Sequence, residues 1–284
     1  MNVAVIKTSA EQGFASTFDE VSAQLPGGTG VRDARRAAID DFARLGLPHR
    51  RIEAWKYTDL RVAVKEALTP AIADRTKLTI ADVIVALGPL AGLDVHRLVF
   101  VNGAFRPELS TRGALAGVDV MPLAAALDEG TTSPSATAGG QEAREGDAVV
   151  ALNTAFMTDG AVLRIADGAK LEKPILIACV RAGADRRLVS TRNHLHIGSN
   201  AEATVIECFA TLPGAATEGQ INTLTETLVG DGARLAHVKC AIDTGSVSHL
   251  ATWLSTLGAG SVYRAFHLTA GPELARSQAF IDFA

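Results

Sequence analysis

The 284-residue sequence contains few of the residues that mark several common classes of protein. It has three cysteines, and its only aromatic side chains are those of ten Phe, two Trp and two Tyr. An odd number of cysteines without a Cys-x-x-Cys pair predicts neither a disulfide framework nor a zinc ribbon. The formal net charge of −4 includes no basic surplus, which argues against a nucleic-acid-binding protein.

Long apolar runs are also missing. The longest candidate, residues 83–93, is interrupted by Gly88, Pro89 and Gly92, and is shorter than the ~20 apolar residues of a membrane helix. Residues 1–13 lack the basic start and the apolar core of a signal peptide. We therefore expect a cytoplasmic protein without a membrane partner.

Sequence motifs of nucleotide-binding proteins and hydrolases are absent. The sequence contains no GxxxxGK[ST], no GxSxG, and no GxGxxG after a strand pattern. The Gly-rich stretch 258–261 lacks a following helix, so we interpret it as a corner. No catalytic residue is predicted.

Small residues are abundant, and the first third of the chain has a helical pattern. The sequence holds 49 Ala and 26 Gly, and 48% of it is hydrophobic, which suffices for a sizeable core. Phe14, Phe18 and Val21 recur at helical spacing before residues 26–28 (PGG), and a second helix is predicted from about residue 32 to Gly46. We assign residues 1–95 to an N-terminal helical region.

One segment of this region concentrates the rare aromatic residues. Trp55 and Tyr57 lie within residues 47–60, beside a cluster of mixed charge. We interpret the segment as a structural contact that pins the helices to the next domain, with a binding role as the alternative.

Residues 96–147 are predicted to hold a hairpin and a linker. Two strand patterns flank Asn102-Gly103, a dipeptide that suits the positive φ angles of a two-residue hairpin turn. Residues 127–147 are polar and rich in Gly, Ser and Thr, which is typical of a loop.

Beyond a short predicted helix at about 148–157, the sequence becomes repetitive. Gly168, Asn200, Gly232 and Gly260 each precede a strand-like run, at spacings of 32, 32 and 28 residues. Such a period is typical of a repeat architecture, and alternation with period two indicates strands rather than helix pairs.

The repeats align into columns that suit stacked coils. Lys170, Glu202 and Arg234 share one column, and two further columns pair Glu207 with Lys239 and Cys208 with Cys240. We expect the charged columns to lie outside as a surface ladder and the two sulfurs to face inward. A parallel β-solenoid with residues 148–284 as its coils is the favoured fold, and a β-sandwich is the alternative.

Five segments carry a resemblance to a known family. Residues 50–60 (RRIEAWKYTDL) resemble a signature of the SufB/SufD family of iron–sulfur cluster assembly proteins, and of its SufD branch in particular. Four further segments are similar to that family in the same order: 97–110, 168–177, 201–209 and 271–280. The resemblance extends from about residue 40 to residue 284.

The resemblance implies a mostly β protein, a right-handed parallel β-helix preceded by an N-terminal α-helical region. It also implies a non-catalytic scaffold subunit of a SufBCD-type complex, with a SufB-like scaffold subunit and a SufC-like ATPase as partners. The iron–sulfur cluster would be held only in the full complex, so we expect no cofactor in this chain. The sequence stops within a coil and has no match for the family's cluster-associated histidine. We therefore expect the coils to be incomplete at the C-terminus.

Four side chains are candidate metal ligands. Cys208 and Cys240 could supply thiolates for iron–sulfur chemistry, although small apolar packing is the favoured role for them and for Cys179. His194 and His196 alternate along one predicted strand, so both would face one side and could form half of a metal site.

Two other functions remain as alternatives. A β-helix enzyme acting on polysaccharide would carry clustered charges and aromatic residues on one coil face, for which Trp253 and Tyr263 are the available non-Phe aromatics after residue 160. A self-associating structural solenoid would pair through its uncapped end.

Overall fold

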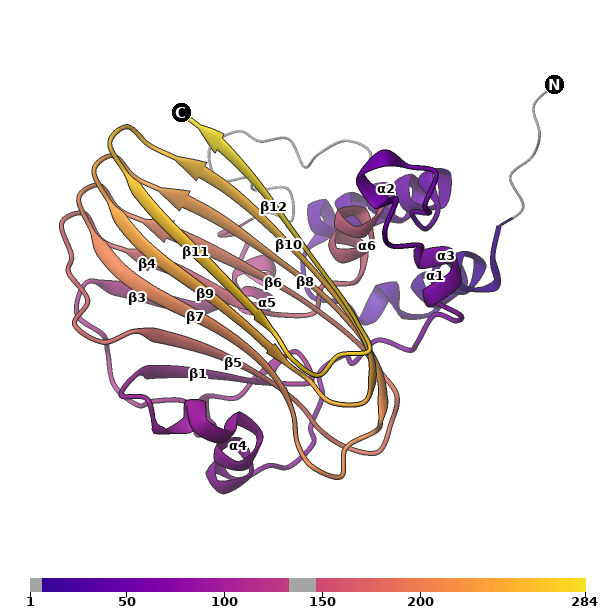
Figure 1. Cartoon of the computed structure of the whole chain (residues 1–284), viewed down its shortest axis with the longest axis horizontal. Helices are drawn as coiled ribbons and strands as arrows, with labels where there is room; N and C mark the ends of the chain where they lie inside the picture. Colours follow the sequence, from indigo (N-terminus) through magenta and orange to yellow (C-terminus); the bar gives the residue numbers. More distant parts are fainter. Residues whose placement is uncertain (1–6, 133–146) are drawn as a thin grey trace.

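Two six-stranded sheets form the body of the protein (Figure 1). The computed structural model describes residues 7–132 and 147–284. One sheet has the order β11-β9-β7-β5-β1-β2, and the other has the order β12-β10-β8-β6-β4-β3. The first sheet contains β1 (His96–Val101), β2 (Ala104–Phe105), β5 (Ile175–Arg181), β7 (Glu202–Thr211), β9 (Arg234–Ile242) and β11 (Val262–Thr269). The second contains β3 (Val118–Pro122), β4 (Ala161–Ile165), β6 (Leu188–Ile197), β8 (Glu218–Val229), β10 (Ser246–Leu257) and β12 (Leu274–Phe283).

The chain alternates between the two sheets and builds a β-solenoid of about four turns. Strands of successive turns pair in parallel, as in β7 with β9 and β8 with β10. The predicted corner residues Gly168, Asn200, Gly232 and Gly260 all have φ between 57° and 67°. Glycine and asparagine tolerate this left-handed conformation, which explains why these residue types recur once in each turn. The mostly β fold class with an N-terminal helical region is confirmed.

The predicted columns are in register, but two of them face the opposite way. Glu207 pairs with Lys239 and Cys208 with Cys240, as expected. The expectation of outward charges and inward sulfurs at these positions is wrong: Glu207 and Lys239 are almost fully buried between the sheets. Cys208 and Cys240 lie on the outer side, in a cluster with Val83 and Leu87 of helix α4 (Ile80–Leu87). The predicted alternation of inward and outward side chains was correct. The prediction of which side chains face inward was not, because the interior accommodates polar side chains at these positions.

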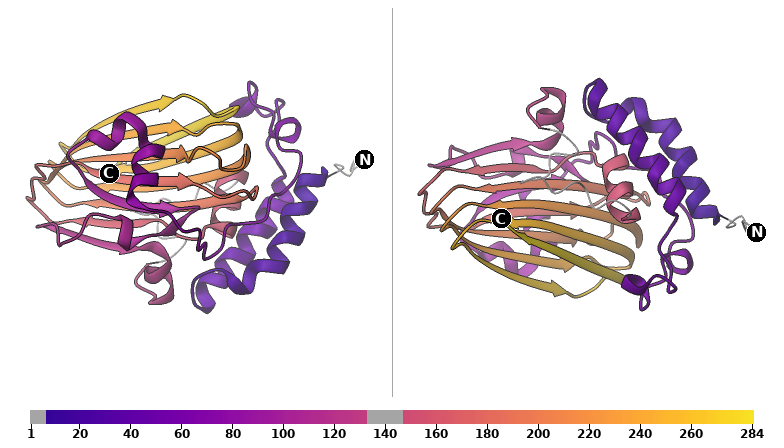
Figure 2. Two further views of the ribbon diagram at one scale, coloured as in Figure 1. Left: turned by 90° about the horizontal axis from the view of Figure 1, so that it is seen from below. Right: turned by 90° about the horizontal axis from the view of Figure 1, so that it is seen from above.

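Helices cover the outer face of the β6-β8-β10 sheet at one end of its strands (Figure 2). They are α1 (Ser9–Val21), α2 (Thr29–Leu45) and α6 (Ala148–Phe156). Thr8 and Glu11 form a capping box at the start of α1, and Gly46 ends α2 with φ of 71°. The second helix begins about three residues earlier than predicted. Phe156 contacts both Phe14 and Phe18 in the shared core.

The segment with the rare aromatics links the helical region to the last coil. It contains the 3-10 turn η2 (Glu53–Trp55) and leads to α3 (Leu60–Ala63). The guanidinium of Arg276 on β12 lies 3.9 Å from the centroid of the Trp55 ring and donates a 2.6 Å hydrogen bond to the carbonyl of Ala54. Because Trp55 is buried and Tyr57 is 90% exposed, the pinning contact is made by Trp55.

The remaining elements close the first turn of the solenoid. The predicted hairpin forms between β1 and β2, with positive φ at Asn102 and Gly103. Helix α4 (Ile80–Leu87) and the 3-10 turn η3 (Gly88–Gly92) lie over the outer face of the β1-β5-β7 sheet. A 3-10 turn η4 (Pro107–Leu109) follows β2, and α5 (Leu123–Asp128) follows β3. Most of the predicted polar linker lies outside the described residues.

Candidate functional site: a buried polar cluster in the solenoid

One inward column of the β1-to-β11 sheet changes from aliphatic to polar along the solenoid. Its members, in order of the strands, are Leu98, Ile177, Glu207, Lys239 and His267. Buried charges are stable only when they are paired or hydrogen-bonded. The surroundings of Glu207 and Lys239 therefore define the candidate site.

The Glu207 carboxylate receives hydrogen bonds from four side chains. His237 Nε2 lies 2.7 Å from Oε1, and Trp253 Nε1 donates to the same oxygen at 3.1 Å. Thr225 Oγ1 donates at 2.9 Å, and Asn193 Nδ2 lies 3.2 Å from Oε2. Burial opposes ionisation of Glu207, yet the hydrogen bonds and the nearby Lys239 lower its pKa overall. The carboxylate is therefore held in its charged form by protein side chains.

The His237 ring is fixed on three sides. Because an ionised carboxylate only accepts, Nε2–H donates to Glu207, and Nδ1 lies 2.9 Å from the Tyr263 hydroxyl. The ring also stacks on Trp253, with 3.8 Å between centroids and 11° between planes. Burial raises the pKa of Tyr263. This tyrosine therefore remains a neutral hydrogen-bond donor at physiological pH.

Lys239 has a less complete environment. Its ammonium has no hydrogen-bond partner among the described residues and lies 5.2 Å from the centroid of the Phe209 ring. Burial lowers the pKa of Lys239 to about 8, although Glu207 and Asp243 oppose the shift. Nearby, His249 Nδ1 lies 3.0 Å from an oxygen of Asp243, and burial followed by the charge of Lys239 lowers the pKa of His249 to about 4. The cluster thus combines a satisfied carboxylate with an unsatisfied ammonium.

This arrangement can hold charge and protons inside the coil stack. The carboxylate oxygens of Glu207 are occupied by protein donors, so they are not free to act on a substrate. Among residues 7–132 and 147–284, no group of three or more His, Cys, Asp or Glu side chains could hold a metal ion. The geometry thus favours a role in fixing how the coils stack.

The histidines predicted as half of a metal site lie on the sheet that contains β6, on its outer face and away from the Glu207 cluster. His194 and His196 share the outer face of β6, as their alternation predicts, but they contact different surroundings. His194 Nδ1 lies 3.1 Å from Thr132 Oγ1, and burial with the charge of Arg192 lowers the pKa of His194 to about 3. Glu226 lies 3.4 Å from the Arg192 guanidinium, and burial raises the pKa of Glu226 to about 7. His196 is exposed.

The three cysteines are buried and free. Cys179 faces the interior in the column of Phe209, and burial raises its pKa well above the ordinary value. Burial also raises the pKa of Cys208 and of Cys240. The thiols are therefore protonated and packed, and the structure does not gather Cys208 or Cys240 with either predicted histidine.

The aromatic residues considered for polysaccharide binding are not on a coil surface. Trp253 is 1% exposed and Tyr263 contacts His237 from the last turn, so both face the interior. A sugar-binding platform requires exposed rings. The Glu207 cluster itself was not predicted from the sequence, although the register of Glu207 with Lys239 was a signal for it.

Comparisons with known proteins agree with the sequence resemblance. Residues 8–177 match the family model of the SufBD protein N-terminal region, and residues 180–284 match the model of the SUF system FeS cluster assembly SufBD core domain. No helix within the described ranges is long and apolar enough to cross a membrane.

Two curated relatives support the match. An iron–sulfur cluster assembly SufBD family protein of Synechocystis is 29% identical over 249 residues, which is 85% of this chain and 54% of the relative. The iron–sulfur cluster assembly protein SufD of Escherichia coli is 28% identical over 224 residues, 75% of this chain and 47% of the relative. The chain thus spans about half the length of these relatives. It belongs to the SufBD family of the SUF system for iron–sulfur cluster assembly.

Proposed function

We propose that the chain is a non-catalytic scaffold subunit of a SufBCD-type complex that assembles iron–sulfur clusters. The observation that carries the proposal is the match of the two SufBD family models, which together account for residues 8–177 and 180–284. The Escherichia coli relative is named as the SufD protein of iron–sulfur cluster assembly. A SufB-like scaffold and a SufC-like ATPase are the proposed partners.

The chemistry of the described residues supports a scaffold rather than an enzyme. The buried Glu207 has its hydrogen-bonding capacity filled by protein donors, and the three thiols are protonated and packed. A catalytic acid, base or nucleophile must reach its substrate. In the proposal, the chain binds no cofactor of its own, and the cluster is cargo held in the assembled complex. A cytoplasmic location belongs to the same proposal, because free thiols suit a reducing compartment.

Co-expression tests this proposal. The tagged chain is produced with a SufB-like and a SufC-like protein and purified under gentle conditions. We expect the partners to be retained, and cluster-forming activity to depend on all three proteins. The Glu207→Gln variant, which keeps the size of the side chain, should retain the same partners if its role is structural. Purification of the chain without either partner would contradict the proposal.

Self-association is a second candidate function, favoured by one observation. Ile281 and Phe283 of β12 pair with inward-facing residues of β10 and face the same way. Their side chains are nevertheless 40% and 83% exposed. Exposed apolar positions on an edge strand favour pairing with another chain. Light scattering over a concentration series should then show a rising mass, and a constant monomer mass would remove this candidate.

A further inference from the structure

The outer face of the β11-β9-β7-β5 sheet carries two apolar rows across four neighbouring strands. The rows are Leu176–Ile206–Val238–Phe266 and Ala178–Cys208–Cys240–Leu268. Outward positions of a sheet that faces water are normally polar. Unbroken apolar rows therefore indicate that something packs on this face.

Helix α4 covers only the first half of these rows. Its Val83 and Leu87 are fully buried in a cluster with Leu176 and Cys208 on β5 and β7. Exposure increases along the first row from 0% at Leu176 to 60% at Phe266. In the second row, it increases from 0% at Ala178 to 43% at Leu268. Cys240 is still buried at 5% exposure, so we call the less covered part, Val238, Phe266 and Leu268, the β9–β11 shelf.

The shape of the shelf suits a helix. Strand β9 is hydrogen-bonded to a strand on each side, whereas β11 is the edge strand of the sheet within the described residues, so only its outer border presents free backbone groups and the rest of the face presents side chains. An apolar sheet face is usually covered by the apolar stripe of a helix, as α4 does beside it. A second helix on the shelf would extend the helical layer that α4 begins.

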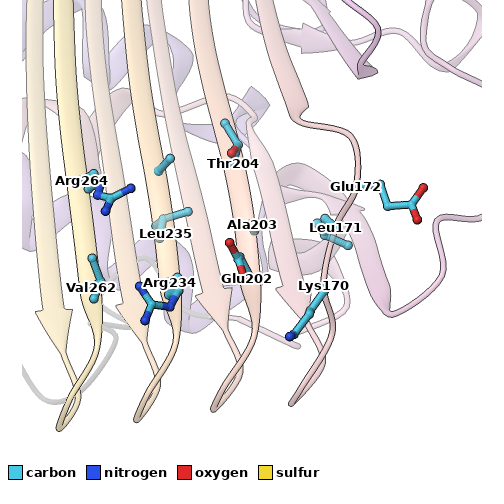
Figure 3. A pocket seen from close by; sticks show the side chains of 11 residues that line it. Lys170, Leu171, Glu172, Glu202, Ala203, Thr204, Arg234, Leu235, Val262 and Arg264 are labelled. Carbon is cyan, nitrogen blue, oxygen red and sulfur yellow. The ribbon is translucent and has the colours of Figure 1, made fainter.

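Charged side chains lie next to the shelf on the same face, and the basic ones (Lys170, Arg234 and Arg264) outnumber the acidic ones (Glu172 and Glu202) (Figure 3). Lys170, Glu202 and Arg234 form a row across neighbouring strands, and Arg264 lies beside it, two residues before Phe266. They surround a hollow of about 310 Å³ whose floor includes Thr204. Neither Arg234 nor Arg264 forms an ion pair within 4.0 Å with a carboxylate of the described residues. The hollow therefore offers two free guanidinium groups to a carboxylate.

We propose that the β9–β11 shelf binds an amphipathic α-helix of a partner protein, with leucine-like side chains on Phe266 and Leu268 and acidic side chains toward Arg234 and Arg264. The charges favour a different protein over a second copy, because a two-fold dimer through this face would bring two hollows with a basic surplus into one interface. The inference goes beyond the proposed scaffold function and does not depend on cluster assembly.

Peptide binding to the whole 284-residue chain tests this inference. The probe is a fluorescent amphipathic helical peptide with leucines on one face and glutamates along its border, and the control peptide has lysines in place of the glutamates. By fluorescence anisotropy we expect the glutamate peptide to bind at least about tenfold more tightly than the lysine peptide. Equal binding of the two peptides would overturn the inference.

Variants separate the shelf from the rest of the surface. The double variant F266S/L268S should weaken binding of the glutamate peptide at least about tenfold, and Arg264→Glu should reduce or reverse the preference between the peptides. Val62→Ser, which changes another exposed apolar residue, is the matched control and should leave binding unchanged. Urea unfolding of each variant verifies that it is folded. Unchanged binding by a folded F266S/L268S variant would contradict the inference.

Sedimentation of the same proteins tests whether a second copy of this chain, rather than a partner helix, occupies the shelf. We expect the wild type and F266S/L268S to have the same mass. If the wild type forms dimers that F266S/L268S abolishes, a second copy occupies the shelf and the proposed partner helix is wrong. Because none of these measurements uses a SufB-like or SufC-like protein, failure here leaves the proposed scaffold function to its own test.

Discussion

The interiors of the early and late turns of the solenoid differ sharply in chemistry. In the same inward column, the early turns place Leu98 and Ile177, and the later turns place Glu207 and Lys239. An aliphatic column is stabilised by burial of apolar area, whatever its exact partners. A polar column is stable only if each group finds its partner, so it ties neighbouring turns into one register.

Replacing Glu207 should have the largest effect on the polar column. Glu207→Leu has a similar volume but removes the acceptor of His237, Trp253, Thr225 and Asn193. We expect the free energy of unfolding to fall by about 3–5 kcal/mol, because buried donors are left unpaired. Urea unfolding measures the loss. Glu207→Gln, which keeps one acceptor oxygen, should lose less, and equal stability of Glu207→Leu and wild type would refute the assigned role.

Replacing Lys239 should raise the free energy of unfolding, whereas replacing Glu207 should lower it. Lys239→Met removes a buried ammonium without a hydrogen-bond partner and keeps a flexible apolar chain. Because burial destabilises this ammonium more than Glu207 and Asp243 stabilise it, we expect a gain on the order of 1–4 kcal/mol near pH 7. The gain should depend on pH. The native pKa of about 8 lies below the ordinary lysine pKa of 10.5, so the unfolded chain binds more protons between these values.

Wild-type stability should therefore rise with pH from about 8 to 10.5, relative to Lys239→Met. Below about pH 8, the difference between the two proteins should be constant and at its largest. Urea unfolding at several pH values measures it, and Lys170→Met at an exposed position serves as the control. A difference that does not change between pH 7 and 10 would show that Lys239 is not desolvated.

The aliphatic column should tolerate exchange. Ile177→Leu conserves volume at a fully buried position, so its cost should stay below about 1.5 kcal/mol. Urea unfolding compares it directly with Glu207→Leu. If the two substitutions cost the same, the contrast between early and late turns would have no energetic meaning.

The cysteines should show the smallest effect, a difference in rate rather than in stability. Burial raises the pKa of all three thiols, so a thiol reagent should label the native protein slowly and the urea-unfolded protein quickly. Mass spectrometry of the labelled protein identifies each site. Rapid native labelling of Cys208 would argue against its packed role.

The sequence allowed the solenoid and its corners to be predicted because both depend on local rules. Gly168, Asn200, Gly232 and Gly260 are required by a left-handed backbone, and strand alternation follows from covalent geometry. The capping glycine Gly46 and the hairpin at Asn102-Gly103 were predictable for the same reason.

The candidate site was not predictable because it depends on which face is inside. The register of Glu207 with Lys239 was correct, but alternation alone leaves the phase undetermined, and charged residues are expected to face water. The network is made by residues as distant in sequence as Asn193, Glu207 and Trp253. Only the stacked turns bring them together.

The central proposal is that this chain is a non-catalytic scaffold. Its most direct test is the mass and the cluster content of a co-expressed assembly. Light scattering and iron analysis are applied to the chain alone and to the chain with SufB-like and SufC-like proteins. The account predicts a single assembly that contains all three proteins and the cluster, and an iron-free chain on its own. A chain that elutes apart from both partners, or that carries the cluster alone, would contradict it.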